Sequence, residues 1–129
     1  MENKMLENRI DSMVEAYMVA VDCREGAAPF HSLEHILETF RFFERYGDFI
    51  LDVERSGQGS LLLDRMNGYM DSYVAHPGSD FLRRAGTYLY AGALYNIFIQ
   101  WLVCGKAEDA LISLAGRIAK LGNQMLAAV

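Results

Sequence analysis

Apolar residues recur every three or four positions along most of this chain, which is the spacing of a helix with one buried face. Glycine and proline interrupt the pattern between the periodic segments. The spacing predicts helices over residues 3–23, 33–43, 48–53, 61–74 and 80–104, and a last one from residue 107 onward. We therefore expect an all-α protein, a helical bundle of five to six helices with short loops.

Three residues are expected to mark helix ends. Asp48 and Ser60 are candidate N-caps of the third and fourth helices, because their side-chain oxygens can accept a hydrogen bond from a free backbone N–H. Gly105 is expected to adopt a left-handed conformation just beyond the fifth helix. No repeat or linker divides the 129 residues, so residues 1–129 are expected to form one domain.

The most unusual segment is 85–103, which reads AGTYLYAGALYNIFIQWLV and contains no charged residue. A helix at a protein surface shows a polar face to water, whereas this segment is apolar nearly all the way round. Lipid could cover it, or its own domain could cover one side and a second subunit the other. Tyr88, Asn96 and Gln100 add polar groups that do not suit hydrocarbon, and no basic cluster flanks the segment. We therefore expect a second subunit and no membrane contact.

Charge and cysteine usage narrow the class of protein further. The net charge is −5 and no Lys/Arg cluster occurs, so this chain offers no surface that would neutralise nucleic-acid phosphates. Cys23 and Cys104 fit no metal-binding or redox spacing and are most simply reduced thiols of a cytoplasmic protein. No signal-peptide pattern opens the chain.

The C-terminal part carries a recognisable arrangement. Segment 88–101 reads YLYAGALYNIFIQW, and upstream of it segment 40–51 reads FRFFERYGDFIL. After Gly105 come the residues Glu108-Asp109-Ala110 and the apolar stripe Leu111, Leu114, Ile118 and Leu121. Over about residues 30–125 the chain resembles the C-terminal ligand-binding and dimerisation domain of TetR-type transcriptional regulators.

The resemblance implies a homodimer that binds a small apolar or aromatic effector and acts on transcription. It also implies that DNA is contacted only through an N-terminal helix-turn-helix module, which is absent from this chain. Residues 1–21 resemble the helix that follows that module. The chain is then either the regulatory domain of a longer repressor or a natural protein without a DNA reader. The first is favoured because the chain begins where the domain junction of the family falls.

The dimer interface is expected on the last two helices. On a helical wheel, segment 85–103 has one stripe of mostly small residues, which lets another helix approach closely. The last helix supplies a second apolar stripe, and two such helices from each of two chains would make a four-helix interface. The residues expected there are Leu89, Gly92, Ala93, Asn96, Gln100, Leu111, Ala115 and Ile118.

The remaining expected core is rich in methionine and aromatic residues. That mixture suits an apolar cavity with a few orienting hydroxyl groups, although it is also typical of an ordinary core. Together with the resemblance, it predicts a ligand pocket between the second, fourth and fifth helices, with no cofactor. The residues expected to bind the ligand are Phe43, Met66, Tyr69, Met70, Tyr73, Tyr88, Tyr95 and Phe98.

One motif suggests a different chemistry. His31 and His35 lie on one face of the second predicted helix with Glu34 close by, a spacing that can bind zinc. Two ligands on one helix leave a site incomplete, and Ser32 stands where a zinc-hydrolase glutamate would follow. No nucleophile motif occurs, so neither a metal site nor an enzyme is expected. The alternative to a sensor is a helical protein–protein interaction module with no small-molecule ligand.

Overall fold

The computed structural model describes residues 2–22, 32–73 and 81–127. Within these ranges the protein is all-α with no strand, which confirms the prediction from the hydrophobic pattern. The elements are α1 (Glu2–Tyr17), a π-helical turn (Met18–Asp22), α2 (Leu33–Glu44), α3 (Gly47–Arg55), α4 (Gly59–Tyr73), α5 (Phe81–Val103) and α6 (Glu108–Ala127).

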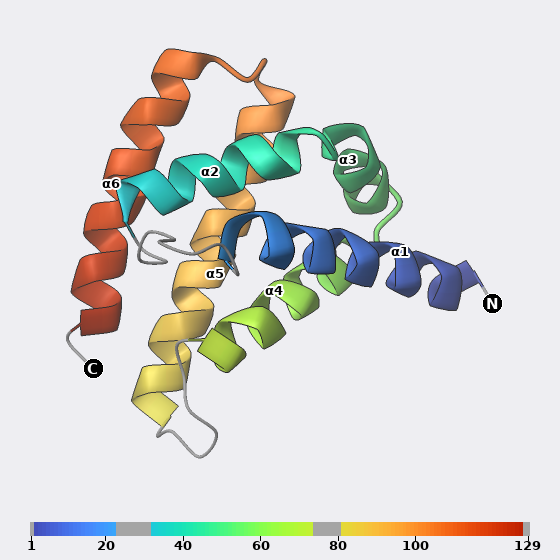
Figure 1. The fold of residues 1–129 in the computed structure, drawn as a ribbon, viewed down its shortest axis with the longest axis horizontal. Coiled ribbons are helices and arrows are strands. Elements are labelled where there is room, and N and C mark those ends of the chain that lie inside the picture. The colour runs from blue at the N-terminus through green and yellow to red at the C-terminus, as the bar shows by residue number, and fades with distance from the viewer. Residues whose placement is uncertain (1, 23–31, 74–80, 128–129) are drawn as a thin grey trace.

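The long α5, which carries no charge from Ala85 onward, is the centre of the arrangement. It packs against α4 and against α6, while α2 packs across α6 and α1 lies against α2 and α4. Figure 1 shows α2 passing in front of the α5–α6 pair, with α3 at the far end of the same layer. The central position explains why α5 can be apolar on most of its circumference.

The core draws on five helices. The largest fully buried side chains include Ile10 of α1, Phe40 of α2, Met70 of α4, Tyr90 of α5 and Leu111 of α6. Burial of each such side chain contributes roughly 1.5–3 kcal/mol of transfer free energy. Every long helix contributes at least one of these side chains, so the core is shared and the helices stabilise one another.

The helix ends confirm one expected marker and correct two. Gly105 has φ +98°, the left-handed conformation expected beyond α5. Asp48 is not an N-cap, because α3 already begins at Gly47. A Cβ at Gly47 would make a tight contact, 3.3 Å, with the Leu102 side chain of α5. Ser60 is not an N-cap either, because α4 begins one residue earlier, at Gly59.

The first helix also differs from the prediction of one regular helix over residues 3–23. Its α-helical part ends at Tyr17 and continues as the π-helical turn Met18–Asp22. Residues before and after this junction are buried, since Tyr17 and Val21 belong to one buried cluster with Phe42 of α2. The wider turn therefore lies beside Tyr17 and α2. Single π-helical turns are frequently found at functional sites of proteins.

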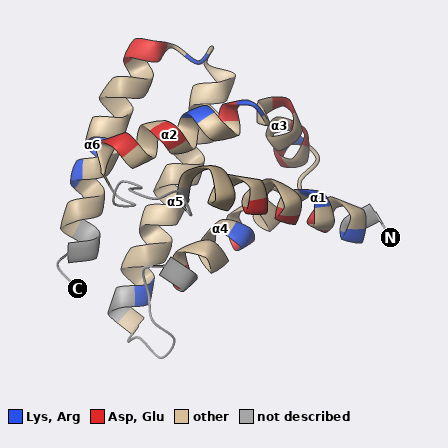
Figure 2. Cartoon of the chain, in the orientation of Figure 1, with Lys and Arg blue, Asp and Glu red and all other residues tan. Residues whose placement is uncertain are grey.

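The outer face of α5 leaves large apolar side chains uncovered. Leu89 is 65% exposed and Val103 is 54% exposed, and Asn96 and Gln100 between them are exposed too. Figure 2 shows that the body of α5 carries no charge, unlike α1 to α4. No helix in the described ranges combines the length and the hydropathy needed to cross a membrane.

Candidate ligand-binding site

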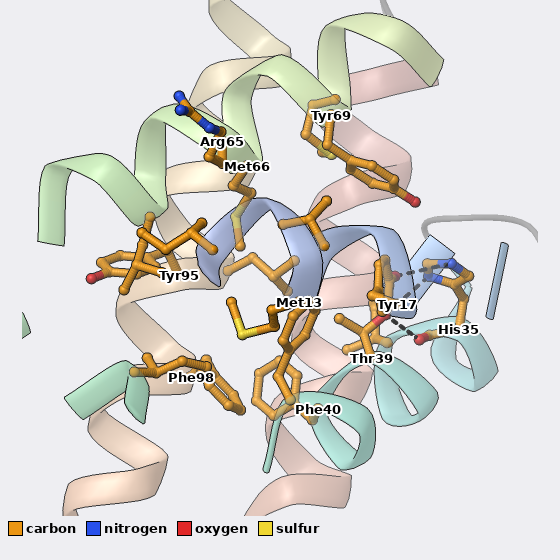
Figure 3. A pocket seen from close by; sticks show the side chains of 18 residues that line it. Met13, Tyr17, His35, Thr39, Phe40, Arg65, Met66, Tyr69, Tyr95 and Phe98 are labelled. Carbon is orange, nitrogen blue, oxygen red and sulfur yellow. Dashed lines mark hydrogen bonds between the residues drawn. The ribbon is translucent and has the colours of Figure 1, made fainter. Parts of the chain in front are cut away.

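A cavity of about 90 Å³ lies where α1, α2, α4 and α5 meet. Figure 3 shows the side chains around it. They are Ile10, Met13, Val14, Tyr17, His35, Ile36, Thr39, Phe40, Phe43, Ile50, Leu62, Arg65, Met66, Tyr69, Met70, Leu94, Tyr95 and Phe98. Almost all the surface that these residues present to the cavity is apolar.

Helical spacing explains how so many side chains reach one cavity. Residues three or four positions apart share one face of a helix, so α1 contributes Ile10, Met13, Val14 and Tyr17 together. The same spacing applies to the contributions of α4 and α5. The cavity is therefore the space left where the apolar faces of four helices do not pack together completely.

Aromatic rings form one part of the wall and methionines another. Phe40 and Phe98 meet edge to face with their centroids 5.2 Å apart, and Tyr17 lies 4.8 Å from Phe43. Such ring contacts hold their geometry well. The thioether chains of Met13, Met66 and Met70 have several rotatable bonds, so this part of the wall can change shape around a ligand.

One corner of the wall contains a hydrogen-bonded polar group. The hydroxyl groups of Tyr17 and Thr39 lie 2.7 Å apart, and Thr39 also donates to the backbone carbonyl of His35 at 2.8 Å. Because Thr39 has a single hydroxyl proton, Tyr17 is the donor in the first of these bonds. The imidazole Nε2 of His35 lies 3.4 Å from the Tyr17 oxygen (Figure 3). These polar groups are thus bonded to one another at the junction of α1 and α2.

Arg65 marks the edge of the cavity between α1 and α4. Its Nε donates to Asp11 at 2.7 Å, and its remaining nitrogens lie 3.0 Å from Asp64 and 3.7 Å from Glu7. The hydrogen bond to Asp11 is the main reason that the pKa of Arg65 is raised. The guanidinium group therefore stays with the carboxylates outside, and its aliphatic stem faces the apolar wall.

Tyr95 closes the opposite edge. Its ring lines the cavity and its hydroxyl donates to the carboxylate of Glu54 at the end of α3. Burial, and next the hydrogen bond to Glu54, raise the pKa of Tyr95 above its usual value. Tyr95 is therefore neutral at every physiological pH and can keep donating to Glu54.

Six of the eight residues predicted to bind a ligand line this cavity. They are Phe43, Met66, Tyr69, Met70, Tyr95 and Phe98. Tyr88 lies elsewhere, because its hydroxyl donates to Asp71 at 2.5 Å beside a separate, more polar groove. The side chain of Tyr73 lies outside the described residues.

The sequence-based prediction missed the contribution of the first helix. It placed the pocket between the second, fourth and fifth helices, whereas α1 contributes four wall residues, including Met13 and Tyr17. The apolar stripe on α1 was visible in the sequence. The stripe itself carries no information on which helices it packs against, so helical spacing alone could not assign it to the cavity.

The residues predicted at the dimer interface fall into two groups. Leu111, Ala115 and Ile118 of α6 are buried in the core of the same chain, so none of them reaches the surface. On α5, Leu89, Asn96 and Gln100 are exposed, and Gly92 and Ala93 are half-buried. The large apolar side chains that the described part of α6 exposes instead are Ile112, at 49%, and Leu121, at 36%.

Only one of the two histidines considered as metal ligands is described by the structure. His35 is buried beside Tyr17 and Thr39, and His31 lies outside the described residues. In the part of the chain that the structure describes, no three His, Cys, Asp or Glu side chains are grouped closely enough to hold a metal ion. Cys104 is an exposed free thiol at the end of α5, and Cys23 lies outside the described residues.

Comparison of the sequence and the structure with known proteins identified no relative. Neither a protein-family model, nor a curated protein, nor a solved structure matches it. The structure alone therefore carries the assignment, which is an all-helical domain of six α-helices in the described ranges.

Proposed function

We propose that this chain is the effector-binding and dimerisation domain of a cytoplasmic transcriptional regulator of the TetR type, and that a small apolar molecule binds in the cavity. The observation that carries the proposal is the cavity itself. Protein interiors are close-packed, and voids larger than a water molecule are few. A volume of about 90 Å³ is well above that limit.

Energetics support a binding role over a packing fault. An empty cavity costs stability, and at about 24 cal/mol per Å³ a void of this size costs roughly 2 kcal/mol. Water gains little there, because the wall offers almost no polar surface to bond it. An apolar molecule that fills the void restores the lost contacts, so occupancy is favourable.

The second part of the proposal is a homodimer formed through the exposed face of α5, with α6 beside it. Leu89 and Val103 of α5 and Ile112 of α6 are large, apolar and exposed. In a two-fold dimer this face meets a copy of itself, and the absence of charge between residues 85 and 103 means that no like charges confront one another. In this proposal, DNA is contacted through an N-terminal helix-turn-helix module outside these 129 residues.

Ligand binding would regulate the dimer by population shift. A ligand moves an equilibrium only by its differential affinity for the two states, so it must prefer one spacing between the paired subunits. Phe98 and Tyr95 line the cavity from the inner face of α5, and the proposed interface lies on the outer face of the same helix. α5 is therefore the element through which occupancy would act on the partner.

Xenon is a suitable probe for the cavity because it is apolar and small. We expect the methyl resonances of Met13, Met66 and Met70 to shift as xenon pressure rises, since all three line the cavity. Met5, which is 66% exposed on α1, is the internal control and should not respond. Equal response of all methionines, or none, would contradict the proposal.

A matched pair of variants strengthens this test. Val14→Phe places a ring in the cavity, whereas Val19→Phe makes the same change at a position that is 72% exposed. Xenon should cease to shift the wall methionines in the first variant and still shift them in the second. Leu62→Phe fills the cavity from α4 and should reproduce the effect of Val14→Phe.

The alternative, an interaction module without a ligand, is favoured only by the exposed face of α5. Both hypotheses predict that the surface around Leu89 binds a partner, either a second copy or another protein. Only the sensor hypothesis predicts that the wall methionines respond to xenon. A dimer whose wall methionines ignore xenon would therefore support the alternative.

A further inference from the structure

Several polar groups of the cavity wall are hydrogen-bonded to other parts of the protein. Tyr95 donates to Glu54, Arg65 donates to Asp11, and Thr39 donates to the backbone carbonyl of His35. The hydroxyl of Tyr17 takes part in the same network through Thr39. In each case the polar atom is hydrogen-bonded to another part of the protein, and the carbon atoms of the side chain face the cavity.

The result is a wall that is chemically uniform. Although six of its residues carry polar atoms, the surface facing the cavity is almost wholly apolar. Polar groups placed to orient a ligand would present donor or acceptor atoms at that surface. A ligand hydroxyl or amine that entered would lose its hydrogen bonds to water and find no replacement.

Resting on the proposed function, we infer that the ligand of this cavity is an uncharged apolar molecule without a hydrogen-bonding group, of about the size of a singly substituted benzene ring. The cavity therefore discriminates against hydroxylated analogues of its own ligand. Shape alone does not provide this selectivity, because a hydroxyl and a methyl group occupy similar volumes.

The volume and the flexibility of the wall together limit the size of the ligand. An empty apolar cavity of about 150 Å³ admits benzene, and the cavity here is about 90 Å³. A ring therefore enters only where the wall yields. Met13, Met66 and Met70 provide this freedom, because unbranched thioether chains repack at small cost.

Toluene and phenol have nearly the same shape and test the inference directly. Dissociation constants are measured for the whole chain by titration of the Met13, Met66 and Met70 methyl resonances. The ratio of the two constants should match the ratio in which the compounds partition into cyclohexane, which cannot hydrogen-bond, so that toluene binds more than about a hundredfold tighter. A ratio nearer to that of partition into octanol, which can hydrogen-bond, would overturn the inference.

Variants at the Tyr17–Thr39 corner give a second, independent readout. Tyr17→Phe and Thr39→Val should leave the ratio of the two dissociation constants unchanged within about threefold, because neither hydroxyl serves the ligand. Selective weakening of phenol in either variant would overturn the inference, because it would show that this corner holds a ligand hydroxyl.

The outcomes separate this inference from the proposed function. Entry of xenon without binding of toluene overturns the inference on ligand class and leaves a functional cavity in place. Failure of xenon, toluene and phenol alike overturns both.

Discussion

The hydroxyl of Tyr95 donates a hydrogen bond to the carboxylate of Glu54, and this bond joins the wall of the cavity to the last turn of α3. The Glu54 carboxylate also lies against Gly59, the first residue of α4. A negative charge is favourable at that position, because the first turn of a helix carries unpaired N–H groups. One pair of side chains therefore connects the cavity, α3 and the start of α4.

Removal of the phenolic hydroxyl should weaken this connection. Tyr95→Phe is expected to lower the free energy of unfolding by about 1–2 kcal/mol, because a hydrogen bond to a charged acceptor is lost while the ring stays in the wall. Urea denaturation followed by circular dichroism measures the change. Glu54→Gln, which keeps an acceptor oxygen, should cost less, and equal losses in both variants would show that charge rather than hydrogen bonding matters.

A side chain at Gly59 is expected to be unfavourable, although helices normally favour alanine over glycine, because it would force the Glu54 carboxylate away from Tyr95. A Cβ at this position would overlap the Glu54 carboxylate and approach the Tyr95 hydroxyl to 2.9 Å. Gly59→Ala should therefore destabilise the protein. Gly68→Ala, in the middle of the same helix with open space around the new Cβ, should instead stabilise it by about 0.5–1 kcal/mol.

The mechanism of this loss can be isolated by a double-mutant cycle. Once Tyr95→Phe has removed the hydrogen bond, the Glu54 side chain is free to turn away from residue 59. The cost of Gly59→Ala should accordingly shrink in the Tyr95→Phe background, as neighbouring sites that share a partner are non-additive. Strict additivity of the two changes would contradict the proposed overlap.

The predictable and unpredictable parts of the site have a common physical origin. Phe43, Met66 and Phe98 could be assigned to one interior because helical spacing places apolar residues on a shared face. Which faces meet depends on crossing angles and on the π-helical turn after Tyr17, and neither leaves a periodic signal in the sequence.

The last helix illustrates the same limit. The stripe Leu111, Ala115 and Ile118 is equally suitable for a partner subunit or for the core, because both environments require small and apolar side chains. In the structure this stripe packs into the core of its own chain. On α5, by contrast, the mixed stripe with Asn96 and Gln100 is exposed, as its polar members allow.

Alkaline pH should unfold the protein through buried tyrosines. Burial raises the pKa of Tyr90 and of Tyr95 above the ordinary tyrosine value of 10.0, and Tyr95 is raised further by Glu54. Between pH 10 and the raised values, the folded state holds protons that the unfolded state has released. The free energy of unfolding should therefore be constant with respect to these groups below pH 10 and fall above it.

Titration from pH 8 to pH 11.5 with urea denaturation at each step measures this dependence. Tyr95→Phe removes one of the two groups, so the decline above pH 10 should become shallower in that variant. Absorbance at 295 nm should show that Tyr90 ionises only as the chain unfolds. An unchanged slope in Tyr95→Phe would mean that this tyrosine ionises without unfolding.

The dimer proposal makes a prediction about mass. Leu89→Arg and Asn96→Arg each place a charge on the exposed face of α5, at positions where the side chain has room in the single chain. In a two-fold interface each new charge faces its own copy, so both variants should raise the dimer dissociation constant by tenfold or more while the helical content stays unchanged.

Val19→Arg makes a similar change at an exposed apolar position on the π-helical turn and should leave the dimer intact. Sedimentation equilibrium reports all four masses. A monomeric parent chain, or equal behaviour of Leu89→Arg and Val19→Arg, would remove the case for self-association through α5.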